Sequence, residues 1–116
     1  MTFGHIELFV ADPQRSRDFY RDALGFTVEA EQSERIIWMK KDHVEILLRP
    51  AAEIDAFPRY ESAPFGFVLY TDDLAATSAE LERRGIAFRG TVDSDKCLTF
   101  TDPDGHWFQL VDPNDH

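Results

Sequence analysis

Two polar side chains of this chain stand in segments that are otherwise apolar. Glu45 is followed by the apolar run 46–48, and Gln109 lies within the apolar run 107–111 near the C-terminal end. A buried carboxylate is costly unless a cation or a hydrogen-bond donor faces it. A buried amide also needs a partner. We therefore expect Glu45 to line a polar pocket. We expect Gln109 to contact either a ligand or another interior group.

His5 and Cys97 are two further residues with reactive side chains. His5 shares a predicted strand face with Glu7, and the residues alone leave open whether it binds a ligand or pairs with Glu7 or Glu45. Cys97 is the only cysteine in the sequence, which excludes an internal disulfide and a cysteine-only zinc site. No helix N-terminus is predicted beside it, so we expect it to line a pocket wall or the core rather than act as a nucleophile.

These residues lie on strands that alternate with helices in a repeated order. The first half predicts a strand over 5–10, a helix from Asp12 to about residue 24, and strands from 26, over 35–40 and over 43–49, with 29–34 as a turn. The second half predicts a strand over 65–70, a helix from Asp73 to Gly85, a strand over 86–89, and a final hairpin. The segment Asp102–Gly105 has the composition of the hairpin turn.

The two halves read as an internal repeat. Asp12 and Asp73 are 61 positions apart, and Glu45 and Gln109 are 64 positions apart. The prediction is one α+β domain over 1–116 with two paired β-α-β-β-β modules, 3–50 and 65–112, joined by a loop over 51–64. Their helix-free faces would enclose a cleft. Residues expected to line this cleft and bind a ligand are Glu7, Phe9, Trp38, Glu45, Leu47, Tyr70, Cys97 and Gln109.

Composition excludes several classes of partner. The chain has 116 residues, with 22 acidic and 12 basic side chains and a net charge of −10. Nucleic acids and anionic membranes both require a positive surface, so neither is expected as a partner. The sequence has no long apolar segment and no signal peptide pattern, so a cytoplasmic location is expected. Each short module leaves one sheet face open, which predicts a homodimer.

The order of elements resembles the vicinal oxygen chelate superfamily, which includes glyoxalase I, extradiol dioxygenases, and fosfomycin- and bleomycin-resistance proteins. The resemblance is carried by residues 5–12 as the opening strand and cap, residues 19–26 as the helix and its exit, and residues 100–106 as the closing hairpin. It covers nearly the whole chain. It implies the fold, while the superfamily spans several reactions and also metal-free binding proteins.

The resemblance also implies where a metal ion would bind. Ligands in metal-dependent members lie on the first and fourth strands of each module, which here gives His5 and Glu45, then Gly66 and Gln109. Gly66 has no ligand side chain, and a neutral amide is a poorer partner than a carboxylate for a hard cation. The expected site is therefore incomplete, with His5, Glu45 and Gln109 as its remaining ligands.

Two functions follow from this comparison. The first is a glyoxalase- or bleomycin-resistance-like protein that binds a small organic molecule, neutral or cationic, in an acidic and aromatic cleft without a required cofactor. The alternative is a metal-dependent lyase, isomerase or dioxygenase that uses His5, Glu45 and Gln109 to hold Ni, Mn, Fe or Zn weakly, with open positions for catalysis. The sequence leaves open whether the protein is an enzyme.

Overall fold

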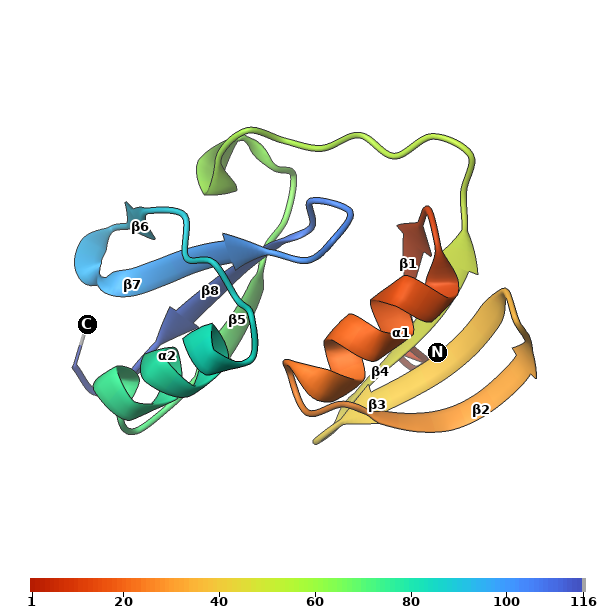
Figure 1. Ribbon diagram of the computed structural model, residues 1–116, viewed down its shortest axis with the longest axis horizontal. Coiled ribbons are helices and arrows are strands. Elements are labelled where there is room, and N and C mark those ends of the chain that lie inside the picture. The colour runs from red at the N-terminus through yellow and green to blue at the C-terminus, as the bar shows by residue number, and fades with distance from the viewer. Residues whose placement is uncertain (116) are drawn as a thin grey trace. The chain divides into compact units, whose positions relative to one another are not determined.

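Two compact units form the protein in the computed structural model, which describes residues 1–115 (Figure 1). The first unit is Met1–Ile54, and the second begins at Asp55. Each unit contains a four-stranded sheet with one parallel and two antiparallel strand pairs, together with one α-helix. The predicted α+β class with two β-α-β-β-β modules is confirmed. The division between the units falls within the predicted 51–64 loop.

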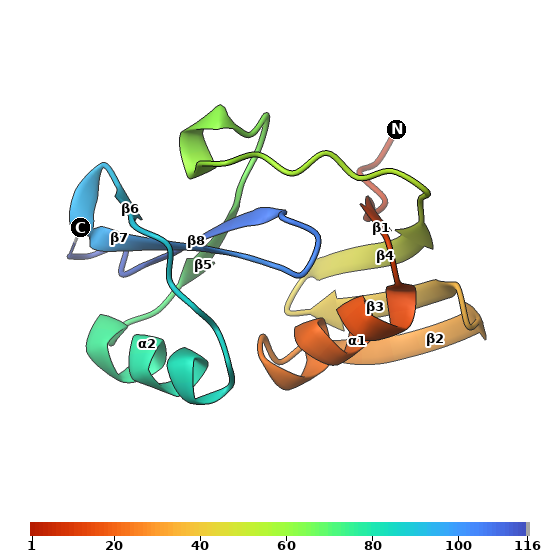
Figure 2. The same ribbon diagram turned by 45° about the horizontal axis from the view of Figure 1, so that its top comes forward.

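The first unit has the strand order β1-β4-β3-β2. Its elements are β1 (Ile6–Val10), α1 (Pro13–Asp22), β2 (Thr27–Ser33), β3 (Ile36–Lys41) and β4 (Val44–Pro50). Helix α1 packs on one face of this sheet (Figure 2). Alternate strand residues are buried with Tyr20 of the helix, and they are Leu8, Val10, Ile37, Met39, Ile46 and Leu48. The opposite face of the same strands is therefore free of the helix.

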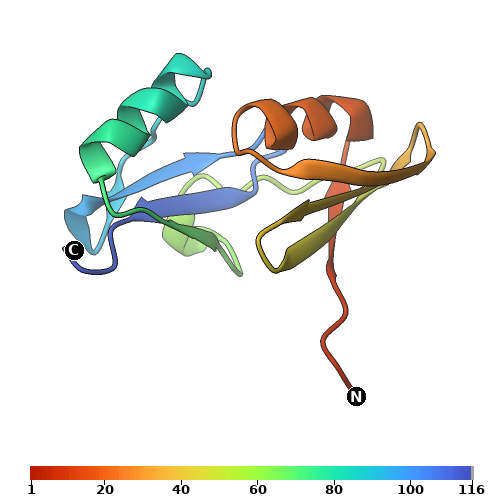
Figure 3. The same cartoon turned by 90° about the horizontal axis from the view of Figure 1, so that it is seen from below.

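The second unit has the equivalent order β5-β8-β7-β6. Its elements are a 3₁₀ helix (Tyr60–Ser62), β5 (Phe67–Tyr70), α2 (Leu74–Arg83), β6 (Thr91–Val92), β7 (Ser94–Thr101) and β8 (Trp107–Val111). Helix α2 covers one face of this sheet (Figure 3). Phe100 and Phe108 are buried on neighbouring strands, and their rings stack with centroids 5.0 Å apart. This aromatic pair forms the centre of the second core.

Short polar motifs set the helix boundaries as the sequence predicts. The Asp12 carboxylate accepts hydrogen bonds from the backbone N–H groups of Gln14 and Arg15, and the Asp73 carboxylate accepts one from Ala76. Gly85, just past α2, has φ +97°, a conformation that residues with a Cβ rarely adopt. Each helix therefore begins at an aspartate, and α2 ends at a glycine.

Two strand predictions are wrong. Residues 29–33 belong to β2 rather than to a turn, and this edge strand is almost entirely exposed, so it lacks the apolar alternation that marks a buried strand. In the second unit, the short strand is Thr91–Val92 rather than residues 86–89. Arg89 and Gly90 still pair with Thr99 through backbone hydrogen bonds, so the pairing with β7 begins at the last residue of the predicted strand.

The turn between β7 and β8 is organised by a buried carboxylate. Asp102 accepts hydrogen bonds from the backbone N–H groups of Asp104 and His106, and its Oδ2 lies 2.6 Å from Nδ1 of His106. Gly105 has φ +91°, which completes the tight turn. His106 is thus a structural residue of the hairpin.

Candidate functional site

The helix-free face of the first unit carries most of the residues predicted for a ligand site. Strand pairing places Glu7 beside Leu47, and Leu47 beside Trp38, across β1, β4 and β3. On the same face, Phe9 lies beside Arg49. Phe9 is 50% exposed, whereas Leu47 is only 2% exposed. The structure therefore brings Glu7, Trp38 and Leu47 together as neighbours, with Phe9 at one end.

Glu7 is the charged centre of this face, and its charge is compensated. Arg49 Nε donates to Glu7 Oε1 at 2.8 Å, and His5 Nε2 lies 3.1 Å from Glu7 Oε2. These hydrogen bonds, that of Arg49 first, lower the pKa of Glu7 below its usual value. The His5 ring also meets Trp38 edge-on, with centroids 4.5 Å apart. His5 therefore pairs with Glu7, one of the two partners considered from the sequence.

Glu45 lies in a different environment from the one that its apolar neighbours suggest. Its side chain is exposed, and Lys40 is its cross-strand neighbour on β3. An exposed carboxylate with a cation across the strand retains its hydration, so desolvation does not force a ligand contact on it. The acidic character expected of this face is thus balanced by Arg49 and Lys40.

The helix-free face of the second unit is built around Trp107, which is only 3% exposed. The guanidinium carbon of Arg89 lies 4.7 Å from the centroid of the Trp107 ring, in a cation–π contact. Arg89 also donates to Thr101 Oγ1, and Thr101 is the strand neighbour of Trp107. The second face therefore holds a cation against an indole ring, a feature that the sequence did not predict.

Residues 56–62 form a covering segment that lies over β8 on this face, on the side of the sheet opposite α2 (Figure 2). Trp107 Nε1 donates to the backbone oxygen of Phe57 at 2.8 Å, and Gln109 Nε2 donates to the Tyr60 hydroxyl at 3.2 Å. Ala56 lies so close to Gly105 that a Cβ on this glycine would be 2.9 Å from the Ala56 Cβ. Trp107 and Gln109 contact this segment from one side of β8 because side chains alternate along a strand, and Gly105 contacts it from the preceding turn.

The Tyr60 ring lies directly over Gly66. A Cβ added to Gly66 would be 2.7–2.8 Å from the outer atoms of that ring, which is closer than real Cβ contacts allow. The Tyr60 ring also meets Trp107 edge-on, with centroids 6.4 Å apart. Tyr60 is not among the site residues predicted from the sequence. The signal that could have indicated it was Gly66, a residue without a side chain at a position where the superfamily resemblance implies a metal ligand.

Strand register refines the correspondence between the two modules. Ile6 pairs with Ile46, and Phe67 pairs with Phe108, so equivalent positions differ by 61 on the first strands and by 62 on the last. In this register, Gln109 corresponds to Leu47 rather than to Glu45. Gln109 lies beside Val68, one strand position beyond Phe67. Both Glu45 and Gln109 remain on helix-free faces, but they are not equivalent in register.

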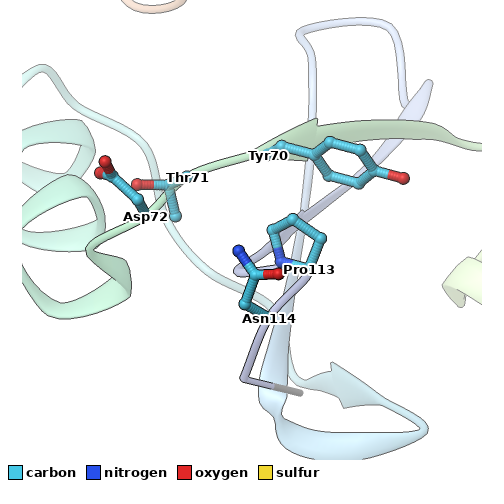
Figure 4. Close-up of a pocket in the computed structure, with 5 residues that line it drawn as sticks. All are labelled: Tyr70, Thr71, Asp72, Pro113 and Asn114. Carbon is cyan, nitrogen blue, oxygen red and sulfur yellow. The ribbon is translucent and has the colours of Figure 1, made fainter.

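The remaining predicted residues are placed separately. Cys97 is buried on β7, with its Sγ 3.6 Å from the Ser94 hydroxyl. Tyr70 is 74% exposed at the end of β5. It borders an open depression of about 450 Å³ with Thr71, Asp72, Pro113 and Asn114 (Figure 4). This depression lies beyond the ends of β5 and β8, and neither Trp107 nor Gly66 lines it.

The residues of the second unit do not fit a metal ion. Gly66 offers no side chain, the Tyr60 ring fills the adjacent space, and Gln109 already donates its amide to Tyr60. In the first unit, His5 and Glu7 are engaged with each other, and Glu7 is also bound to Arg49. Within residues 1–115, no group of three or more His, Cys, Asp or Glu side chains is arranged to hold an ion. No helix in this part of the chain is long and apolar enough to cross a membrane.

Comparison with known proteins identifies the family. The model of the Glyoxalase/Bleomycin resistance protein/Dioxygenase superfamily matches residues 2–110, and the chain belongs to this superfamily. A comparison with curated proteins finds no match.

Solved structures with the same fold span several activities. TnmS3, an antibiotic binding protein from Streptomyces sp. CB03234, is 29% identical, with 97% of this chain and 98% of that chain covered and a TM-score of 0.62. Lactoylglutathione lyase from Agrobacterium tumefaciens is 19% identical, with 97% and 93% covered and a TM-score of 0.69. The fosfomycin resistance protein FosX from Listeria monocytogenes is 14% identical, with 96% and 90% covered and a TM-score of 0.73. At identities this low, the last two show the fold alone.

Proposed function

We propose that this protein binds a small organic molecule on its helix-free sheet faces and that binding, rather than turnover, is its activity. The observation that carries the proposal is the Tyr60 ring over Gly66, because it fills the space where a metal-dependent relative would need a ligand side chain. The likeness to TnmS3, described as an antibiotic binding protein, supports the same class of function.

The contacts on these faces favour a neutral, aromatic ligand. Trp38 and Phe9 provide apolar surface in the first unit, and the half-exposed Val68 does so in the second. Binding sites for small molecules combine such surfaces with a few polar groups that fix orientation. Since Glu7 is already paired with Arg49 and His5, the acidic residues give less support to a cationic ligand than the sequence suggested.

A thermal-shift screen tests the proposal. The purified protein is screened against neutral aromatic compounds, polyphenols, cationic antibiotics and the glutathione–methylglyoxal hemithioacetal, each with and without Ni²⁺, Mn²⁺ or Fe²⁺. A ligand that binds the folded state raises Tm, and the rise grows with the logarithm of its concentration relative to Kd. We expect neutral aromatic compounds to raise Tm without added metal.

Matched variants test whether the ligand binds on the helix-free face of the first unit. Phe9→Ala should weaken the best ligand of the screen several-fold, since a half-exposed ring on the sheet is lost. Phe3→Ala removes a ring that is 87% exposed before β1, and it should leave the affinity unchanged. Metal-dependent turnover of any screened compound, abolished by Glu45→Gln, would instead establish the enzyme alternative.

A further inference from the structure

We propose that Gly66, Trp107 and Gln109 form a subsite for a phenol-like ring, and that Tyr60 of the same chain occupies this subsite. The inference rests on the proposed function and names the chemical group that the second unit recognises. It extends to ligands with an aromatic ring that carries an oxygen acceptor, of which phenol is the smallest.

The floor of the subsite is the backbone of Gly66. The Tyr60 atoms Cε2, Cζ and OH would lie 2.7, 2.8 and 2.8 Å from a Cβ at this position. The hydroxyl end of the ring therefore rests where any other residue would place its side chain. Gly66 is not among the residues with positive φ, so its backbone conformation does not require glycine. A side chain at this position would instead have to push the Tyr60 ring aside.

The walls supply the two interactions that a phenol needs. Gln109 Nε2 donates to the hydroxyl oxygen, and Trp107 meets the ring edge at an interplanar angle of 87°. Edge-to-face contact and a hydrogen bond at the polar end are the usual partners of a buried tyrosine ring. Arg89 lies over the Trp107 ring and donates to Thr101, which holds the indole in place.

Tyr60 is attached to the rest of the unit in a way that would let a free ligand replace its ring. Tyr60 begins a single 3₁₀ turn that is closed by Ser62, whose side chain bonds the backbone of Arg59, and the turn lies outside both the sheet and the helices. Tyr60 is itself half-buried. A free ring with an oxygen acceptor can make the same contacts with Gly66, Trp107 and Gln109, and its binding requires only that this turn move aside.

The test replaces the tethered phenol with a free one. Tyr60→Ala empties the subsite in the full-length chain, and p-cresol, the analogue of the tyrosine side chain, is titrated while binding is followed by calorimetry. We expect p-cresol to bind Tyr60→Ala at least tenfold more tightly than the unaltered protein. Toluene, which lacks the hydroxyl, should bind Tyr60→Ala more weakly than p-cresol does.

Control variants define the walls. Adding Gln109→Leu to Tyr60→Ala should remove the preference for p-cresol over toluene, and adding Gly66→Val should abolish binding of both. Tyr70→Ala removes an exposed tyrosine at the end of β5 and should give no gain in p-cresol affinity. Tyr60→Val, which leaves less empty space, replaces Tyr60→Ala if the latter does not fold.

Saturable p-cresol binding that is equal in Tyr60→Ala and Tyr60→Ala/Gly66→Val would overturn the subsite, as would a folded Tyr60→Ala or Tyr60→Val that binds no p-cresol. The outcome is independent of the ligand screen. A screen without hits, combined with tight p-cresol binding to Tyr60→Ala, would reject the proposed function while retaining the subsite.

Discussion

Gly66 shows how a single missing side chain changes what a site accommodates. The absence of a Cβ lets the Tyr60 ring lie against the backbone, where it also receives a hydrogen bond from Gln109. The absence of a side chain at Gly66 and the close approach of the Tyr60 ring therefore depend on each other. Restoring a side chain at this position must displace Tyr60.

Gly66→Ala tests this close approach. We expect it to lower the free energy of unfolding by about 1 kcal/mol, because the added methyl group overlaps the Tyr60 ring. In a Tyr60→Ala background the overlap is gone, and Gly66→Ala should be neutral or stabilising by up to about 1 kcal/mol, since alanine reduces the entropy of the unfolded chain. Urea unfolding of the unaltered protein, the two single variants and the double variant gives the coupling free energy between positions 60 and 66. The same effect in both backgrounds would contradict the close contact.

His106 contributes a pH-dependent contact at the β7–β8 turn. Burial of the ring tends to lower the pKa of His106, but the hydrogen bond with Asp102 and the charges of Asp102 and Asp104 outweigh it and raise that pKa above the usual value. A raised pKa in the folded state means that protonation favours folding. The contribution is complete below about pH 6.5 and is lost as the pH rises through the raised value.

His106→Gln measures this contribution. At pH 6 the variant should be less stable than the unaltered protein by roughly 1.5–3 kcal/mol, the range for a hydrogen bond that involves a charged group. At pH 9 the difference should be smaller. Thermal unfolding of both proteins between pH 6 and 9 provides the comparison, and a gap that widens with pH would contradict the assignment.

At the scale of elements, both helices begin at an aspartate whose side chain satisfies backbone N–H groups of the first turn. Asp12→Ala and Asp73→Ala should each lower the free energy of unfolding by about 1 kcal/mol. The two caps share no partners, so the effects in the double variant should add.

Asp72→Ala is the matched control for the caps. Asp72 also precedes α2 and is exposed, but the hydrogen bond to Ala76 comes from Asp73. We expect Asp72→Ala to change the stability by less than about 0.5 kcal/mol, as for ordinary surface substitutions. Equal losses for Asp72→Ala and Asp73→Ala in urea titrations would mean that the cap is misassigned.

At the scale of the whole molecule, each unit leaves apolar side chains exposed on its helix-free face. Phe9 is 50% exposed in the first unit, and Val68 and Tyr70 are 47% and 74% exposed in the second. Adjacent exposed apolar residues favour association. The high net charge of −10 opposes non-specific association, so any contact between copies should be specific.

We therefore predict a homodimer in solution. Light scattering after size exclusion should give about twice the chain mass of 13.4 kDa. Val68→Lys should shift the protein to the monomer because it buries a charge in the contact. Val44→Lys, at a similarly exposed position at the start of β4, is the control and should leave the dimer intact. A monomer at high concentration would reject this prediction.

The sequence by itself determined the repeated order of elements. The caps at Asp12 and Asp73, the glycine after α2 and the turn before β8 are local signals, so they can be recognised without knowledge of distant contacts. Alternation also assigned the helix-covered and helix-free faces of the buried strands. It failed for β2, because an exposed edge strand has no apolar periodicity to detect.

Only the tertiary structure decided which side chains meet on the helix-free faces. Glu7 pairs with Arg49, 42 residues later in the sequence, because β1 and β4 are parallel neighbours. Glu45 takes no part in this ion pair. Tyr60 reaches Gln109 across 49 residues through an irregular segment. Periodicity assigns a residue to a face, but its neighbours depend on strand register and on the path of the connecting loop.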